Sequence, residues 1–236
     1  MDRKALSAAF PVTVPVLMGY LAIGMAFGLM MDSAGYNVFW ALLMSLIIYA
    51  GAGQYMGVTL LAAGASPLQT ALMTLLLNFR HMFYGLSMLE KFRGMGLRKL
   101  YMIFSLTDET YALLASAKAP EGVREKDYYL AIALMDHSYW VLGTVLGSLL
   151  GSALSFDTTG VDFAMTALFI VIAVDQWSAY RSHLPALLGF GVTVVSLVLL
   201  GPDAMLIPAL CVIIVILLLL RARLDAGEEA ARKEEV

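Results

Sequence analysis

Apolar runs of membrane-span length occupy most of this chain, and short polar turns separate them. Each run approaches the ~20 residues that cross a bilayer as a helix. Turn signals such as Gly64-Ala65-Ser66-Pro67 and Gly201-Pro202-Asp203 mark boundaries between the runs. The pattern predicts an all-α, polytopic integral membrane bundle that forms a single transmembrane domain over residues 1–236. The runs cover residues 11–31, 37–62, 66–89, 98–117, 127–153, 161–181, 184–200 and 203–222, and a charged tail follows at 223–236.

The segment 98–117 differs from the others because carboxylates lie near its middle and basic residues flank both of its ends. Lys and Arg collect on the cytoplasmic side of membrane proteins. If the segment crossed the membrane, one basic cluster would lie outside. If it is re-entrant or lines a polar cavity, both clusters lie inside and only Arg3 and Lys4 break the rule. The second arrangement predicts about seven spans plus one polar segment, with the N-terminus outside and the C-terminus inside. The flanking cations are Lys91, Arg93, Arg98 and Lys99 before the segment and Lys118, Arg124 and Lys126 after it.

A weak internal repeat appears at an offset near 123 residues. It would relate the halves 11–89 and 127–200 and leave the span 203–222 outside. Under the seven-span arrangement the halves have opposite orientations, which is the inverted 3+3 repeat common in secondary transporters. The matched positions are Gly24 and Gly28 with Gly147 and Gly151, and Gly53-Gln54-Tyr55 with Asp175-Gln176-Trp177.

Glycines interrupt the second apolar run at Tyr49-Ala50-Gly51-Ala52-Gly53-Gln54. They favour a broken helix whose freed N–H groups bind an anionic group, or a close helix crossing that small residues allow. The sequence leaves both interpretations open. Gly19, Gly24 and Gly28 carry no polar partner like Gln54, so close helix packing is the better interpretation for them.

The phrase Asn78-Phe79-Arg80-His81-Met82-Phe83-Tyr84-Gly85 places polar and ionisable groups inside a membrane-length run. Such groups are costly in a bilayer unless they are paired or face water, so they mark a functional site by default. Arg80 is expected to pair with Asp108 or Glu109, although it could also reach the interface with its long side chain. His81 could carry a coupled proton or be a hydrogen-bonded structural residue.

Further ionisable residues lie in later apolar runs. Asp175 stands among Ile, Val and Ala, so a solvated loop explains it poorly. Asp136 and His137 lie about ten residues into their run. The candidates for proton coupling are His81, Asp108, Glu109 and Asp136.

Composition excludes several classes of function. The chain is 61% hydrophobic and 14% charged, and no basic face for nucleic acid is evident. A zinc-protease motif, a phosphate-binding P-loop and a nucleophile elbow are missing from the sequence. With three His and one Cys, we expect neither a metal site nor a cofactor, and no enzyme activity.

Three phrases resemble the AzlC family of branched-chain amino acid transport proteins, of the YgaZ and BrnF type. They are Ile48-Tyr49-Ala50-Gly51-Ala52-Gly53-Gln54, Asn78-Phe79-Arg80-His81-Met82-Phe83-Tyr84-Gly85 and Leu106-Thr107-Asp108-Glu109. The resemblance implies a permease subunit in the cytoplasmic membrane of a bacterium or archaeon. It also implies a small AzlD-type membrane partner and export of branched-chain amino acids driven by an ion gradient, with no ATPase.

The expected substrate is therefore a zwitterion with an apolar side chain. Its carboxylate could meet the N–H groups near Gly51 or the guanidinium of Arg80, and its ammonium a carboxylate. The alternative function is a channel-like or scaffolding subunit without its own substrate site. The candidate substrate-binding residues are Tyr49, Gly51, Gly53, Gln54, Asn78, Arg80, Tyr84, Asp108, Glu109, Trp140, Asp175 and Gln176.

Overall fold

The computed structural model describes residues 3–153, 182–202 and 211–220, together with positions 163, 166–167, 170, 173–174, 177–178, 205 and 208–209. Every regular element in this part of the chain is an α-helix, as the sequence predicted. The chain divides into two compact units, Met1–Leu168 and Phe169–Val236, and each is described by itself.

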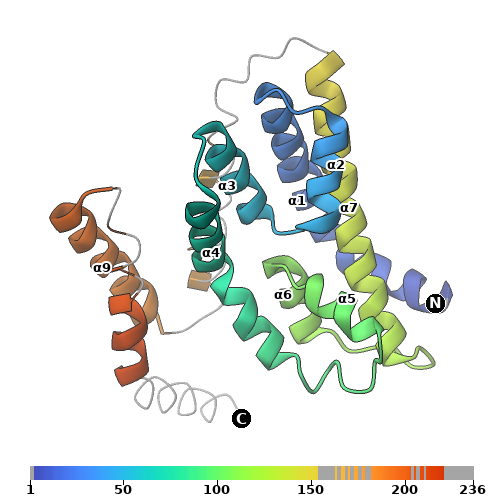
Figure 1. The fold of residues 1–236 in the computed structure, drawn as a ribbon. Coiled ribbons are helices and arrows are strands. Elements are labelled where there is room, and N and C mark those ends of the chain that lie inside the picture. Colours follow the sequence, from blue (N-terminus) through green and yellow to red (C-terminus); the bar gives the residue numbers. More distant parts are fainter. Residues whose placement is uncertain are drawn as a thin grey trace. The chain divides into compact units, whose positions relative to one another are not determined.

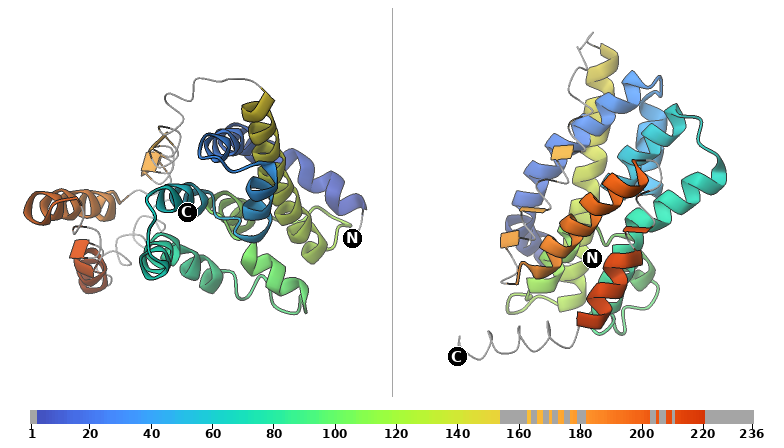
Figure 2. Two further views of the ribbon diagram at one scale, coloured as in Figure 1. Left: turned by 45° about the horizontal axis from the view of Figure 1, so that its top comes forward. Right: turned by 90° about the vertical axis from the view of Figure 1, so that its left-hand side faces the viewer.

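Two long helices, α1 (Arg3–Ser33) and α7 (Glu125–Ala153), form the frame of the first unit (Figure 1). With 31 and 29 residues they exceed the length needed to cross ~30 Å of hydrocarbon. Both are also apolar enough to do so. They lie side by side along most of their lengths in all three orientations (Figures 1 and 2).

Glycines bring the backbones of α1 and α7 into direct contact. A Cβ on Gly28 would lie 2.2 Å from the carbonyl oxygen of Thr144, and one on Gly147 would lie 2.1 Å from that of Met25. No side chain fits at such distances, so the predicted packing role of Gly28, and of Gly24 one turn earlier, is confirmed. Gly19 differs, because among the described residues a Cβ there would meet nothing within 4 Å, so the described contacts do not support a packing role for it.

The contacts also fix the relative direction of α1 and α7. Gly143 faces Tyr20, Gly147 faces Met25 and Gly151 faces Asp32, so residue numbers rise together on the two helices. The helices are therefore parallel. The expectation that the segments 11–31 and 127–153 have opposite orientations is wrong, because glycine spacing alone carries no information about direction.

The segment 37–62 is a helical hairpin and not one continuous crossing. The helix α2 (Val38–Ile47) begins at Asn37, whose side chain accepts from the N–H of Phe39, and α3 (Gly51–Ala62) follows a short connection. Nε2 of Gln54 donates to Oγ of Ser45 at 3.1 Å, which a straight helix forbids because nine residues would span ~13 Å. The expected single span at 37–62 is therefore wrong.

The chain then runs back along α4 (Pro67–Ser87), which begins with a Ser66 cap and a first-turn proline. A second hairpin follows, built from α5 (Arg98–Phe104) and α6 (Asp108–Ser116). Lys91, before the hairpin, donates to the carbonyl oxygens of Leu114, Ala115 and Ala117 at its end. The segment 98–117 thus enters and leaves at the same end of the unit.

The basic clusters gather at that same end. Asp127, at the start of α7, is buried and pairs with Arg98 at 2.7 Å and with Arg124 at 2.5 Å. Nζ of Lys126 donates to the carbonyl oxygen of Gly94. The start of α1 lies there too, because Ala5 and Ala9 share an apolar cluster with Met88, Phe92, Met95, Tyr128 and Tyr129. The N-terminus is therefore on the side of the basic clusters, and its expected placement on the opposite side is wrong.

In the second unit, α9 (Leu184–Leu200) and the helix Cys211–Leu220 are apolar throughout. Large apolar side chains are exposed in each unit, for example Leu68 at 71% and Phe190 at 73%. Soluble proteins rarely expose such continuous apolar surface, whereas in a bilayer it contacts lipid.

Candidate functional site

The two hairpins point toward each other from opposite ends of the first unit, and their turns meet in its interior. The rings of Tyr49, in the α2–α3 connection, and Phe104, at the end of α5, lie 6.1 Å apart between centroids. Tyr20 of α1 lies 6.5 Å from Tyr49 by the same measure, and its hydroxyl is 2.6 Å from that of Thr107. Tyr20 is near the midpoint of α1, so the meeting point lies halfway through the unit.

The first interruption holds a strained residue. Tyr49 has a φ of 42°, which is uncommon for a residue with a side chain and costs on the order of 1–3 kcal/mol. Such a conformation persists when its surroundings hold it in place. Here the imidazole of His137 stacks on the Tyr49 ring at 4.2 Å between centroids. His137 also contacts Tyr101 of α5 and the carbonyl oxygen of Ser45 of α2, so it links both hairpins to α7.

Trp140 of α7 covers the beginning of α3. A Cβ on Gly51 would lie 3.2 Å from the edge of the Trp140 ring, so any larger residue there would crowd the indole. The indole N–H donates to Oε1 of Gln54 at 2.9 Å, and the amide of Gln54 donates to Ser45. Gln54 is fully buried with both ends of its amide engaged. It therefore holds α3 in place against α7.

The second interruption places two carboxylates at a helix N-terminus. The side chain of Thr107 caps α6 by accepting from the N–H of Thr110, and Asp108 and Glu109 occupy the first turn. Negative charge is favoured there by the helix dipole. The phrase Thr-Asp-Glu is therefore both a capping sequence and the source of the charge at this depth.

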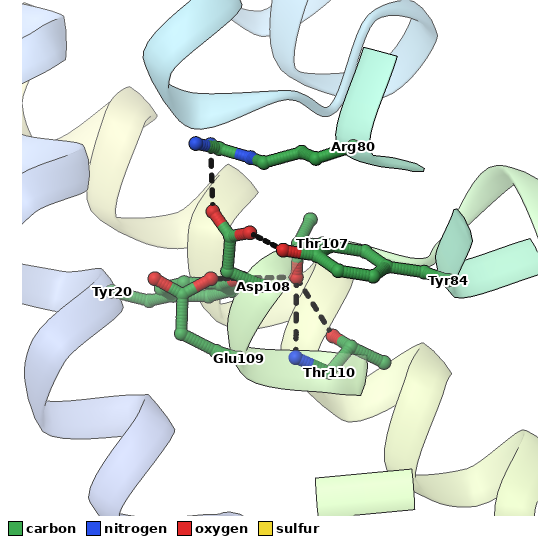
Figure 3. Close-up of polar contacts among 7 residues, drawn as sticks. All are labelled: Tyr20, Arg80, Tyr84, Thr107, Asp108, Glu109 and Thr110. Carbon is green, nitrogen blue, oxygen red and sulfur yellow. Dashed lines mark hydrogen bonds and ion pairs between the residues drawn. The ribbon is translucent and has the colours of Figure 1, made fainter. Parts of the chain in front are cut away.

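Asp108 is the partner of Arg80. A guanidinium nitrogen of Arg80 lies 2.7 Å from Oδ2 of Asp108, and the hydroxyl of Tyr84 donates to Oδ1 at 2.6 Å (Figure 3). The side chains of Arg80 and Asp108 are 28% and 20% exposed. The expected pairing of Arg80 with this acidic segment is confirmed. Tyr84 is held by the ring of Tyr111, stacked on it at 4.3 Å.

A continuous row of hydroxyls connects Glu109 to Asp136. The hydroxyl of Tyr20 lies 2.9 Å from Oε2 of Glu109 and 2.6 Å from Oγ1 of Thr107. Oγ1 of Thr107 is 3.1 Å from that of Thr110, which is 2.9 Å from Oδ2 of Asp136. Figure 3 shows the part of this row from Glu109 to Thr110. Asp136 has no exposed surface.

Several buried polar atoms around this point have no hydrogen-bond partner among the described residues. They are the hydroxyl oxygen of Tyr49, Oδ1 of Asn78, Nε of Arg80 and Oδ1 of Asp136. Buried polar atoms are nearly always paired, so a group of unpaired ones indicates a place where a ligand or water binds. Asn78 also lies close to α3, since a Cβ on Gly53 would be 3.1 Å from its Nδ2.

The structure thus brings most of the sequence-predicted residues into one region. His81 lies at its side, 5.6 Å from Tyr84 between ring centroids. Asp175 and Gln176 are outside the described residues, so their place in this site stays a prediction. Within the described part of the chain, no three His, Cys, Asp or Glu side chains group as a metal site.

Sequence reasoning missed three residues of the hydroxyl row, namely Tyr20, Thr107 and Thr110. Tyr20 is a single polar group in a long apolar run, and its role depends on contacts with residues almost ninety positions away. Thr107 and Thr110 carried a usable signal, because a threonine followed directly by two acidic residues is typical of a helix start.

Comparisons with known proteins agree with the family resemblance. The model of the AzlC protein family matches residues 15–154, which include both hairpins and the site. The chain is 40% identical to the Branched-chain amino acid transport protein AzlC of Bacillus subtilis, over 95% of this chain and 88% of that protein. It is 45% identical to an uncharacterized membrane protein of Helicobacter pylori, over 94% and 97% of the two chains. It is 32% identical to the Inner membrane protein YgaZ of Escherichia coli, over 72% of each.

No solved structure matches the chain significantly. The family model and these relatives nevertheless cover the first unit and extend through most of the chain. The protein is a multi-pass membrane protein with a role in transport and not an enzyme, and it belongs to the AzlC family.

Proposed function

We propose that this protein is a secondary exporter of branched-chain or similar hydrophobic amino acids across the cytoplasmic membrane, driven by an ion gradient. The Bacillus subtilis relative is named a branched-chain amino acid transport protein, which supports the substrate class. The observation that carries the proposal is the Arg80–Asp108 ion pair, placed where two interrupted helices meet. Interrupted helices at mid-depth with paired charges are typical of substrate sites in secondary transporters.

The proposed orientation follows from the positive charges. The cations flanking the second hairpin, together with Arg3 and Lys4, lie at one end of the first unit, which we assign to the cytoplasm. In this orientation α1 and α7 run outward and α4 runs inward. The hairpin α2–α3 enters from outside and the hairpin α5–α6 from the cytoplasm. Within residues 3–153 this gives three full crossings and two re-entrant hairpins, in place of the arrangement with a span at 37–62.

This orientation favours an inverted repeat between different segments from those that the sequence suggested. A long helix followed by a half-depth hairpin occurs twice, as α1 with α2–α3 and as α4 with α5–α6. The two groups point in opposite directions, so they form the inverted pair that a binding site at mid-depth requires. Their geometry favours this pairing over one between 11–89 and 127–200.

The substrate would bind beside the ion pair. Its carboxylate would accept from the guanidinium of Arg80, whose Nε is buried with no partner among the described residues, and from the first N–H groups of α3 at Gly51 and Gly53. Ala50 offers no side chain that could satisfy those groups. The ammonium would be held by Asp108 or Glu109, with Asn78 and the rings of Tyr49, Tyr84 and Trp140 around the aliphatic part. Asp175 and Gln176 remain candidates for the same site.

A small AzlD-type membrane subunit is the proposed partner, and no ATPase is proposed. Exposed apolar side chains on the helices of each unit offer surface for a second membrane protein as well as for lipid. The arrangement α1–α7 contains its own charged site, which favours a transporter over a scaffold.

The proposal is tested by counterflow of labelled leucine in proteoliposomes that contain both subunits. Preloaded unlabelled leucine should draw the label inward, and Arg80→Ala should abolish the exchange. Exchange that needs the partner but is indifferent to Arg80 would contradict the substrate site and favour the scaffolding role.

A further inference from the structure

The row of hydroxyls between Glu109 and Asp136 contains more contacts than its own hydrogens can supply. The row has four oxygen–oxygen contacts, between Glu109 and Tyr20, Tyr20 and Thr107, Thr107 and Thr110, and Thr110 and Asp136. Each lies between 2.6 and 3.1 Å, so each is a hydrogen bond and needs one hydrogen.

Three hydroxyl groups bring three hydrogens, because each of Tyr20, Thr107 and Thr110 donates once. The backbone N–H of Thr110 adds a bond to Thr107 but does not lie within the row. An ionised carboxylate can only accept. A proton on either Glu109 or Asp136 would supply the fourth hydrogen.

We infer that Glu109 and Asp136 together hold one proton, which the hydroxyl row passes between them. With the proton on Glu109, every hydrogen bond of the row is donated in the direction of Asp136. Each hydroxyl then accepts a proton from its neighbour on the Glu109 side and releases its own to its neighbour on the Asp136 side. A proton arrives on Asp136, and every hydrogen bond of the row is then donated in the direction of Glu109. No atom moves further than a bond length, and the total charge of the row stays at one negative unit.

The surroundings of Asp136 support this sharing. Glu109 also belongs to the first turn of α6, next to Asp108 and its partner Arg80. The guanidinium groups of Arg80, Arg93, Arg98 and Arg124 pair with other carboxylates. A buried unpaired carboxylate is costly, so sharing a proton lowers the cost of burying Glu109 and Asp136. The titratable groups that face Asp136 from the elements packed against it are Tyr20 of α1, Tyr49 of the α2–α3 connection, Tyr101 of α5 and Glu109 of α6. His137 and Tyr139 are its neighbours along α7.

The two ends of the row differ in their access to the proposed substrate. Glu109 adjoins the ion pair of Arg80 and Asp108, whereas Asp136 is enclosed by α1, α6 and α7. A substrate ammonium beside Asp108 would favour ionised Glu109 and drive the proton to Asp136. This part of the inference rests on the proposed function and gives one proton per substrate as the coupling stoichiometry.

The proton itself is tested without transport, by infrared spectroscopy of the purified protein in lipid at neutral pH. The carbonyl band of protonated carboxylic acids is compared among wild type, Glu109→Gln, Asp136→Asn and the double variant. In each single variant the amide introduced in place of the acid supplies the fourth hydrogen, so the remaining acid stays ionised and the band of one protonated acid is lost. The double variant has no further protonated acid to lose, so its band should fall by the same amount. Glu90→Gln, which removes an exposed surface carboxylate, is the matched control and should change nothing.

Two results would overturn the shared proton. If the double variant loses twice as much intensity as each single variant, both acids are protonated independently. If none of the three variants loses intensity, both acids are ionised. Size-exclusion chromatography of each variant shows that a loss does not come from unfolding, and both substitutions keep the shape of the side chain.

The coupling role is tested with proteoliposomes under an imposed pH difference. One pH unit should support a leucine gradient of about tenfold in the wild type, since one proton moves per substrate. Tyr20→Phe keeps both acids but breaks the row, so it should lose this gradient. Tyr36→Phe is the control and should keep it. Retention of the gradient by Tyr20→Phe would overturn the pathway, whereas absence of counterflow in the wild type would instead refute the proposed function and leave the infrared result valid.

Discussion

Arg80 of α4 and Asp108 of α6 form an ion pair at 2.7 Å, although 28 positions separate them and the second hairpin turns between them. The pair joins α4 to the tip of the second hairpin. Both side chains keep partial exposure, and Nε of Arg80 has no partner within the described residues. Arg80 can therefore bind a ligand through one nitrogen of its guanidinium while another nitrogen stays paired with Asp108.

Removal of either member of this pair should cost transport more than stability. Arg80→Ala and Asp108→Ala should each reduce leucine counterflow at least about a hundredfold, because a charged substrate that loses its charge partner binds ~3 kcal/mol less tightly. The exchanged pair Arg80→Asp with Asp108→Arg should regain part of the exchange. Equal activity of Arg80→Ala and wild type would contradict the central role of the pair.

The contact between α1 and α7 predicts a sharp difference among glycines. Gly28→Ala should lower the melting temperature in detergent by several degrees, because its Cβ would overlap the backbone of Thr144 and overpacking costs about 1–3 kcal/mol. Gly19→Ala on the same helix is the matched control, since the site is open, and it should have no effect or stabilise slightly. Thermal unfolding followed by intrinsic fluorescence measures both. A similar loss in the two variants would argue against close backbone contact.

The proposed orientation predicts the accessibility of four single cysteines, introduced into a Cys211→Ala background. Arg93→Cys and Arg124→Cys flank the second hairpin and should be labelled from the cytoplasm. Ala34→Cys and Ala63→Cys flank the first hairpin and should both be labelled from outside, because α2–α3 enters and leaves on one side. A membrane-impermeant maleimide applied to cells and to inverted vesicles gives the result.

If Ala34→Cys and Ala63→Cys are labelled from opposite faces, residues 37–62 cross the membrane and the hairpin is refuted. Labelling of Arg93→Cys and Arg124→Cys from opposite faces would do the same for α5–α6. The two pairs are independent, so each hairpin is judged separately.

The hydrogen bond from Trp140 to Gln54 should hold the first hairpin in place. Trp140→Phe keeps an aromatic ring against Gly51 but leaves Oε1 of a buried amide without its donor, a loss of about 1–3 kcal/mol. We expect a lower melting temperature in detergent, followed by intrinsic fluorescence. Trp40→Phe removes an indole that is 49% exposed and is the control. Unchanged stability of Trp140→Phe would show that the hairpin is held by apolar contacts alone.

Sequence alone predicts the helices and the need for charge pairing. Apolar run length predicts membrane helices, because a bilayer of fixed thickness admits only fully hydrogen-bonded segments. The glycines at 51–53 and the threonine–acid phrase at 107–109 marked the positions at which helices begin. The cost of an unpaired charge at depth predicted a partner for Arg80 in the acidic segment, and the structure has that partner.

The direction of the chain after each interruption depends on tertiary contacts. A mostly apolar segment of 26 residues satisfies its backbone equally well as one crossing or as a hairpin, so its composition does not distinguish them. Contacts between distant residues make the choice, such as Trp140 with Gln54 and Lys91 with the carbonyl oxygens that end α6. The same reason explains why Gly28 and Gly19 look alike in the sequence but differ in the fold. It also explains why the link between Glu109 and Asp136 became visible only when Tyr20 was placed between them.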